Sequence, residues 1–218
     1  MKVASHQPCF LPWPGFWHKV CSVDRFILSA GVAWSKDGFI NRIQHAGAWL
    51  ALPVQAESSN APIIDVVIAD DKRRIAKTWK TVAQQTGPYR SRLTTIIDVL
   101  QEVEPGQSLV EINNRLIQLL CGLLGVGTKI TLDTSTSNAA TKTERLYERL
   151  KRHVPGMTEY YLGKGALDYF DRNVFEGVQC FVQDPSQFAP TISILQLIAN
   201  ERDPVDVILS KGRWSPLD

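Results

Sequence analysis

Apolar residues recur at helical spacing through the middle of the chain. Between residues 93 and 103, leucine, isoleucine and valine return at intervals of three and four, which places them on one face of a helix. The same pattern runs from residue 112 to residue 124, and Gly125 and Gly127 interrupt it. We therefore expect residues 71–127 to form a helical segment or subdomain, whose apolar face is explained by packing against a core.

Short runs of apolar and β-branched residues lie on both sides of this segment. We expect strands at residues 2–5, 25–30, 49–54, 63–68, 129–133, 159–162 and 178–182. Further helices are expected at residues 16–20, 141–153, 166–172 and 192–200. This alternation predicts an α/β fold with a mostly parallel, Rossmann-like sheet flanked by helices. Residues 1–70 and 128–218 would then form the two parts of the α/β domain, with residues 71–127 between them.

The composition is typical of a globular chain with one domain, or one domain with an insertion. Of the 218 residues, 44% are hydrophobic and 21% are charged. No apolar run approaches the roughly 20 residues that cross a bilayer. The first residues do not form the charged and then apolar stretch of a signal sequence, because Pro8, Pro12 and Pro14 interrupt it. We therefore expect a cytoplasmic protein.

The four cysteines stand far apart, without a CxxC pair, and are expected to be buried thiols. One spacing suggests a metal site, because His6 and Cys9 are repeated as His18 and Cys21, and two histidines with two cysteines can hold zinc. We interpret this match as accidental, since His18 and Cys21 fall on a helix that can bury them. No metal is expected, and no cofactor is assigned.

His6 is the first candidate for chemistry. It stands where the first strand stops, ahead of a proline-rich loop that leads through Gly15 into a helix. In open α/β sheets, ligands bind beyond the carboxyl ends of the strands. An imidazole there can move a proton near neutral pH, or bind a phosphate or carboxylate. The alternative is a histidine that only hydrogen-bonds the loop.

A set of short motifs runs through nearly the whole chain. In order, they are His6–Pro8, Phe10–Trp13, Gly15–Phe16, Lys19, Asn41–Arg42, Trp49–Leu50, Pro53–Val54, Lys142–Leu146, Tyr160–Gly163, Ser193–Leu195 and Asn200–Glu201. Together they closely resemble the WbqC-like protein family, although Cys9 stands where that family usually has asparagine. Members occur in bacterial surface-polysaccharide (O-antigen) gene clusters. The resemblance implies the glycine- or aminoacyl-transfer role that has been proposed for them.

The start of the helix expected at residues 141–153 is a second candidate. Thr141 and Glu144 fit a capping box. Lys142 and Arg145 lie on one face and place positive charge at the positive end of the helix dipole. A bound phosphate or carboxylate would turn this unfavourable charge into a binding site. The alternative is a solvated basic turn whose charge nearby glutamates offset.

Other polar side chains are candidates for substrate binding. An arginine offers a planar fork to carboxylate or phosphate, an asparagine both donates and accepts hydrogen bonds, and serines add hydroxyl donors. A surface position without function is the alternative for each. These candidates are Lys19, Asn41, Arg42, Ser135, Ser137 and Tyr160.

Residues 72–92 carry seven lysines and arginines and no acidic residue, whereas the whole chain has a net charge of only +2. Such a basic segment can attract DNA, tRNA or a pyrophosphate-bearing substrate. A solvated helix face is the ordinary explanation of a charge run. The positive residues are Lys72, Arg73, Arg74, Lys77, Lys80, Arg90 and Arg92.

No P-loop, GxGxxG or HExxH motif occurs in the sequence. We hypothesise a WbqC-like transferase that joins an amino acid to an amino-sugar or activated carrier. His6 would shuttle a proton or bind phosphate, while Lys142 and Arg145 hold an anionic group in the same pocket. One alternative is an amino acid:DNA transferase that acts on a phosphate-activated base, as in phage DNA hypermodification. Another is a non-catalytic protein that binds a nucleotide or other anion.

Overall fold

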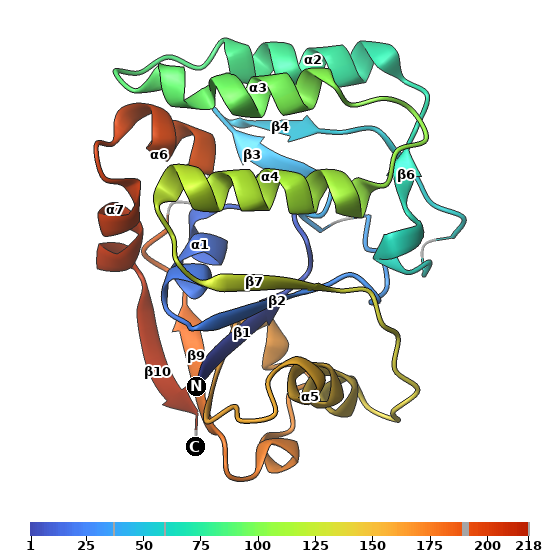
Figure 1. Ribbon diagram of the computed structural model, residues 1–218, viewed down its shortest axis with the longest axis vertical. Helices are drawn as coiled ribbons and strands as arrows, with labels where there is room; N and C mark the ends of the chain where they lie inside the picture. Colours follow the sequence, from blue (N-terminus) through green and yellow to red (C-terminus); the bar gives the residue numbers. More distant parts are fainter. Residues whose placement is uncertain (37, 59, 189–191, 218) are drawn as a thin grey trace.

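The computed structural model describes residues 1–36, 38–58, 60–188 and 192–217. Within them, six strands form a central sheet in the order β10-β9-β8-β1-β2-β7 (Figure 1). β10 is antiparallel to β9, and the other neighbouring pairs are parallel. The predicted α/β fold with a mostly parallel, Rossmann-like sheet is confirmed. The strands are β1 (Lys2–His6), β2 (Arg25–Ser29), β7 (Lys129–Asp133), β8 (Glu159–Leu162), β9 (Gln179–Asp184) and β10 (Arg213–Leu217).

β1 lies in the interior of the sheet, between β8 and β2. Helix α1 (Pro14–Cys21) connects β1 to β2. At the far end of β2, Ser29 pairs in register with Asp133 of β7. Because these strands are parallel, their carboxyl ends meet along one edge of the sheet. His6, the last residue of β1, lies on that edge.

Helices cover both faces of the sheet (Figure 1). α1 and α4 pack on one face, and α5 packs on the other. Among the described residues, no helix combines the length and the apolar character needed to cross a bilayer. The helices that follow α1 are α2 (Lys72–Ala83), α3 (Thr94–Gln101), α4 (Leu109–Leu124), α5 (Lys142–His153), α6 (Ile194–Asn200) and α7 (Pro204–Lys211).

The two faces of the sheet belong to separate cores. Ala4 packs into the larger core, which α1 and α4 share, whereas Val3 packs with Leu146 of α5 in the smaller one. Side chains alternate between the faces of a strand. Ser5 therefore points toward the α5 face, and His6 points toward α1, where its ring meets the ring of Phe16 edge to face at 5.3 Å.

A hairpin lies outside the main sheet, between the helices α2 and α4 in Figure 1. It consists of β3 (Arg42–His45) and the antiparallel β4 (Ala48–Ala51). Ala46 and Gly47 connect them, both with positive φ, as a tight two-residue turn requires.

Two expected strands are wrong in extent. Residues 49–54 divide between β4 and β5 (Val54–Gln55), because Pro53 has no amide hydrogen to donate to a ladder. Residues 63–68 form a turn of 3₁₀ helix before the short β6 (Val67–Ile68), which pairs with β5.

The C-terminal region also differs from expectation. Two separate 3₁₀ turns, Lys164–Ala166 and Arg172–Phe175, replace the helix expected at residues 166–172. Neither α7 nor β10 was predicted, although Pro204 in the first turn of α7 is a common helix-start signal. α2, α3 and α4 occupy the stretch expected to be helical. The proposed division of the chain at residues 70 and 127 stays a prediction.

Candidate functional site

The loop after β1 is held rigidly before α1 begins. Trp17 donates from Nε1 to the carbonyl oxygen of Pro12 at 3.0 Å. Pro14 supplies the first turn of α1 with a preset φ. Gly15 is required here, since a Cβ at this position would lie 2.3 Å from the ring of Trp13. His6 is therefore followed by a loop whose path is fixed by packing.

His6, Cys9 and Lys19 form a cluster at the tip of β1. Nδ1 of His6 donates to the carbonyl oxygen of Gln7 at 3.0 Å, which leaves Nε2 as the acceptor nitrogen of a neutral ring. The thiol sulfur of Cys9 lies 3.5 Å from the same Nδ1. Nζ of Lys19 reaches the carbonyl oxygen of Ser5 at 3.4 Å. A strand end, a loop and a helix thus each contribute one polar side chain.

Burial controls the protonation of this cluster. Lys19 is only 4% exposed, and burial lowers its pKa to about 7, against a small opposing effect of Cys9. Burial, together with the charge of Lys19, lowers the pKa of His6 to about 3. Burial raises the pKa of Cys9 to about 12. Near neutral pH the cluster therefore holds a neutral imidazole, a protonated thiol and an amine that can either carry or release a proton.

Lys19 has no acidic partner in the described part of the chain, where the ion pairs do not include it. A Cβ at Gly163 would lie 3.6 Å from Nζ, so the amine lies against the loop that follows β8. A buried cation without a counter-ion is costly, unless it loses its proton or a ligand supplies the negative charge. This makes Lys19 the strongest functional candidate at the carboxyl edge.

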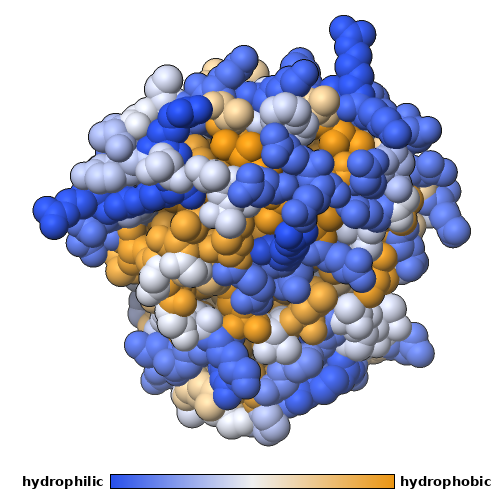
Figure 2. All heavy atoms as spheres, turned by 45° about the horizontal axis from the view of Figure 1, so that its top comes forward, coloured by the Kyte–Doolittle hydropathy of each residue, from blue (hydrophilic) through white to orange (hydrophobic). Residues whose placement is uncertain are grey.

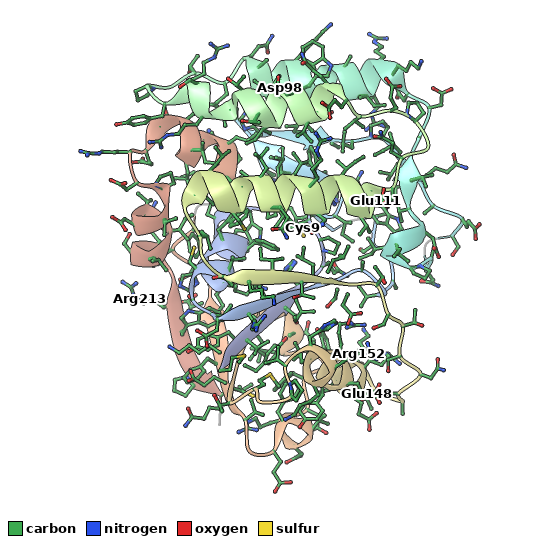
Figure 3. All side chains as sticks on the ribbon, viewed as in Figure 1. Cys9, Asp98, Glu111, Glu148, Arg152 and Arg213 are labelled. Carbon is green, nitrogen blue, oxygen red and sulfur yellow. The ribbon has the colours of Figure 1, made fainter. Side chains whose placement is uncertain are left out.

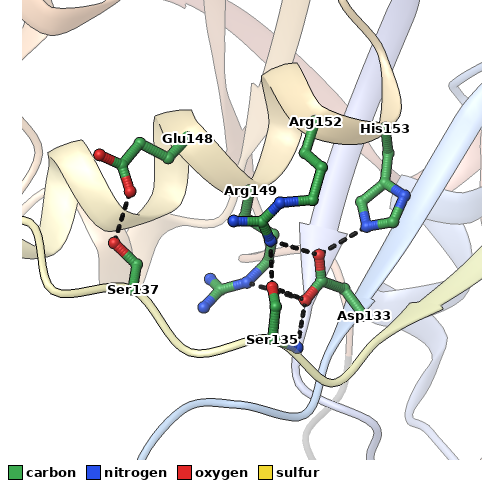
Figure 4. A network of polar contacts seen from close by, with 7 residues as sticks. All are labelled: Asp133, Ser135, Ser137, Glu148, Arg149, Arg152 and His153. Carbon is green, nitrogen blue, oxygen red and sulfur yellow. Dashed lines mark hydrogen bonds and ion pairs between the residues drawn. The ribbon is translucent and has the colours of Figure 1, made fainter.

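A second polar cluster surrounds Asp133 on the opposite face (Figure 4). Nε2 of His153 lies 2.5 Å from Oδ2 of Asp133, and Arg152 reaches the same oxygen at 3.4 Å. Ser135 donates to Oδ1 from its backbone nitrogen at 2.7 Å, and also from its hydroxyl. Nε of Arg149 lies 3.8 Å from Oδ1. The carboxylate is therefore enclosed by donors and positive charge.

The pKa of Asp133 reflects this enclosure. Burial alone would raise it, but the hydrogen bonds from Ser135 and His153 outweigh burial and hold the pKa below its usual value. The side chain of Arg149 is 6% exposed, and its Nε makes no hydrogen bond within the described structure. Ser29, paired in register with Asp133, also has a buried hydroxyl without a partner there. The carboxylate is paired with two guanidinium groups, but the cluster leaves two donors unused.

The start of α5 is built as a capped helix end. The predicted capping box of Thr141 and Glu144 is confirmed. Arg145 donates to the carbonyl oxygen of Ala139 at 2.9 Å, and the ammonium of Lys142 lies 5.4 Å from the ring centre of Tyr169. These contacts are local, and whether an anion binds here stays a prediction.

The remaining predicted serine, Ser137, and Tyr160 have their contacts on the α5 side of the sheet. Ser137 donates to Oε2 of Glu148 at 2.5 Å, so its hydroxyl serves the helix. The hydroxyl of Tyr160 lies 3.0 Å from that of Ser5 at the end of β1. Burial raises the pKa of Tyr160, so this phenol stays protonated at neutral pH. It is part of the smaller core.

The contacts of His6 and of Lys142 lie on different faces of the sheet. Cys9 beside His6 lies between α4 and the sheet, whereas Arg152 of α5 lies beyond the sheet (Figure 3). None of the contacts within the described residues joins His6 to Lys142 or Arg145. The shared pocket that the sequence suggested gains no support from these contacts. The structure groups His6 with Lys19 instead.

Asn41 and Arg42 lie in a third place, at the base of the hairpin. Nδ2 of Asn41 donates to the carbonyl oxygen of Leu52 at 2.8 Å. The guanidinium carbon of Arg42 lies 4.4 Å from the ring centre of Trp49. Both residues line a pocket that Arg74 of the basic segment also lines. Asn41 and Arg42 therefore share a pocket with part of residues 72–92 rather than with His6.

The histidines and cysteines of the zinc-like spacing do not lie together in the structure. Nδ1 of His18 accepts a hydrogen bond from the side-chain amide nitrogen of Gln183 at 2.8 Å, and its ring stacks on that of Trp214 with ring centres 5.0 Å apart. Its contacts lie at the β10 side of α1, whereas Cys9 meets His6 at the strand tip. Among the described residues, no three His, Cys, Asp or Glu side chains gather as metal ligands would.

Comparison with known proteins places this arrangement in a family. The profile of the WbqC-like protein family matches residues 7–204, which include the tip of β1, the hairpin and α5. The chain belongs to the WbqC-like protein family. A protein of Mycobacterium tuberculosis (strain ATCC 25618 / H37Rv), named "Uncharacterized protein Rv1507c", is 26% identical to it over 218 aligned residues, covering 91% of this chain and 93% of the other. No solved structure matches this WbqC-like chain.

The sequence alone did not single out several polar residues of this WbqC-like chain. Asp133 is the last residue of a predicted strand, and this position at a strand end was the signal that could have identified it. Arg149 lies four residues after Arg145 and so continues the same helix face. His153 ends the predicted helix. No signal in the sequence indicated that Lys19 would be buried without a counter-ion.

Proposed function

We propose that this chain is a WbqC-like transferase that passes an amino acid, or a similar small group, to an amino-sugar or activated carrier in surface-polysaccharide synthesis. The observation that carries this proposal is Lys19, a buried amine without a carboxylate partner among the described residues, beside the neutral imidazole of His6. Substrate sites of open α/β sheets lie at this edge. Family membership supports the class of reaction.

The chemistry requires one proton acceptor. The amine of the acceptor attacks the carbonyl carbon of the activated amino acid, and a carbon–nitrogen bond forms. The bond to the leaving group breaks, and its electron pair departs with that group. Lys19 takes the proton released by the attacking amine, which its lowered pKa allows near neutral pH. Nε2 of His6 accepts a hydrogen bond that orients the attacking group.

The test is transfer by the purified protein, followed by mass spectrometry. Aminoacyl-tRNA and aminoacyl-adenylate serve as donors, and an amino-sugar nucleotide serves as the acceptor. We expect Lys19→Met to lower the rate by about 100-fold or more, the usual size of a lost general base. Lys164→Met removes an exposed lysine near the end of β8 and is the matched control. A Lys19→Met rate equal to that of the control would refute the role of Lys19.

A second candidate is an amino acid:DNA transferase, which the exposed lysines and arginines of α2 favour. Here the amine of the amino acid would attack the phosphate-activated carbon of a DNA base and displace the phosphate. This candidate is tested with free glycine and DNA that carries a phosphate-activated base. Glycine attached to the DNA, detected by mass spectrometry, would support it. Tight ligand binding without turnover on either substrate would favour a non-catalytic nucleotide- or anion-binding protein.

A further inference from the structure

A pocket of about 690 Å³ lies between the β3–β4 hairpin and α2. Its size falls within the roughly 300–1,000 Å³ of small-molecule sites. None of the residues assigned above to the tip of β1 lines it. Among the described lining residues, no Asp or Glu occurs, and the positively charged ones are Lys36, Arg42, Arg74 and Lys77. The pocket is therefore suited to a negatively charged ligand.

One wall of the pocket is a cationic face of α2. Arg74 and Lys77 lie one turn apart on this face, and Thr78 continues it. The hydroxyl of Thr78 donates to the carbonyl oxygen of Ala51 at 3.0 Å, which ties α2 to β4. The ion pairs of the described chain include neither Arg74 nor Lys77. Both charges are therefore available to the pocket without a carboxylate from those ion pairs.

The opposite wall carries an exposed aromatic surface. Trp49 lines the pocket and is 48% exposed, an unusual fraction for so large an apolar ring. The ring of Phe39, also exposed, lies 5.8 Å from it. Figure 2 shows the molecule with its α2–α3 end turned forward, and hydrophobic side chains lie there among hydrophilic ones. Indole rings provide nucleobases with a surface for stacking.

The basic segment supplies only part of its charge to this pocket. Arg90 donates to the carbonyl oxygen of Ala83 at 3.1 Å, and Arg92 donates to that of Glu201 at 3.0 Å. These two arginines bond to backbone carbonyls and do not line the pocket. Charge and aromatic surface thus meet at the pocket instead of extending along residues 72–92.

We infer that this pocket binds a nucleoside phosphate, with its base on Trp49 and its phosphates between Arg74 and Lys77. The cations match phosphate, and the ring matches the base. The nucleotide can be free, attached to a sugar, or part of a nucleic acid strand, because all three present the same groups.

Binding is measured by isothermal titration calorimetry with ADP, UDP-N-acetylglucosamine, a short oligothymidylate and inorganic phosphate. We expect saturable binding of at least one nucleotide probe, weakened by added salt. The tightest of the three identifies the source of the nucleotide. The inference is overturned if none of the three binds, or if inorganic phosphate binds as tightly as ADP.

Variants of α2 distinguish nucleotide binding in this pocket from attraction by the overall charge of the helix. Arg74→Gln with Lys77→Gln should weaken nucleotide binding by about tenfold or more, because charged phosphate contacts are strong. Arg73→Gln with Lys80→Gln removes two charges of the same helix that do not line the pocket. Equal losses in the two double variants would overturn the inference.

Trp49→Leu tests the aromatic wall. It should weaken the binding of ADP and leave that of inorganic phosphate unchanged, whereas unaltered ADP binding would overturn the stacking role. These measurements need no turnover, so their failure would leave the proposed transfer reaction at Lys19 untouched.

Discussion

Two clusters at the carboxyl edge of the sheet each contain a buried charged side chain, Asp133 in one and Lys19 in the other, but they are built differently. On the α5 face, Asp133 is enclosed by Arg149, Arg152 and His153, so negative charge meets positive charge. On the α1 face, Lys19 is buried without an acidic partner among the described residues. The charge of Asp133 is therefore compensated within the protein, whereas no carboxylate among the described residues compensates that of Lys19.

This difference separates charge that supports the fold from charge that can serve a ligand. A buried ion pair holds its partners in place, and losing one partner leaves a costly isolated charge. A buried amine without a partner shifts its pKa, which is a mark of functional sites. Both clusters lie at strand ends, so position on the sheet does not distinguish them. Their pairing does.

The largest expected effect is on the free energy of unfolding, at the Asp133 cluster. Asp133→Asn removes the carboxylate and leaves the buried guanidinium of Arg149 uncompensated. We expect the free energy of unfolding to fall by about 3 kcal/mol, as measured by urea denaturation. Glu102→Gln breaks the exposed pair with Arg115 and should cost less than about 1 kcal/mol. A loss at Asp133 no larger than that control would mean that the cluster does not support the fold.

Lys19→Met should not lower the free energy of unfolding as Asp133→Asn does. It removes a buried charge while keeping an unbranched apolar side chain, so the free energy of unfolding near pH 7 should stay equal or rise. The folded pKa of about 7 lies below the ordinary lysine pKa of 10.5, so between these values only the unfolded state holds the proton. Wild-type stability should then rise with pH by up to about 1.4 kcal/mol per unit.

The difference between wild type and Lys19→Met isolates this slope from other titrating groups. Urea denaturation across pH 7 to 10.5 should show a steeper rise for the wild type. If the free energies of unfolding of the two proteins changed with pH in parallel, or if Lys19→Met were as destabilising as Asp133→Asn, Lys19 would be a charge that supports the fold.

The smallest effect is expected at Ser29. Its buried hydroxyl has no hydrogen-bond partner in the described structure, although it pairs in register with Asp133. Ser29→Ala should therefore change the free energy of unfolding by less than about 1 kcal/mol. The expected direction is a small gain in stability, because the substitution removes a buried hydroxyl without a partner. A loss of several kcal/mol in thermal or urea denaturation would show that Ser29 belongs to the network after all.

Local elements followed closely from the sequence. β7 and β8 have the predicted bounds, and the capping box at Thr141 forms as expected. Periodicity and caps depend on neighbours within a few residues, so the chain reports them directly. The edge strand β10 was missed, because its pairing with β9 rather than local β-propensity makes it a strand.

The candidate site was predicted only in part. The sequence alone determined that His6 ends a strand at the carboxyl edge of the sheet, since strand ends can be recognised from local patterns. Only the tertiary structure decided which face each side chain meets, because one residue along a strand reverses its direction. It also decided that Lys19 is buried without a counter-ion and that Asp133 is enclosed by α5. Burial and pairing depend on residues distant in the sequence, and those set the charge of both clusters.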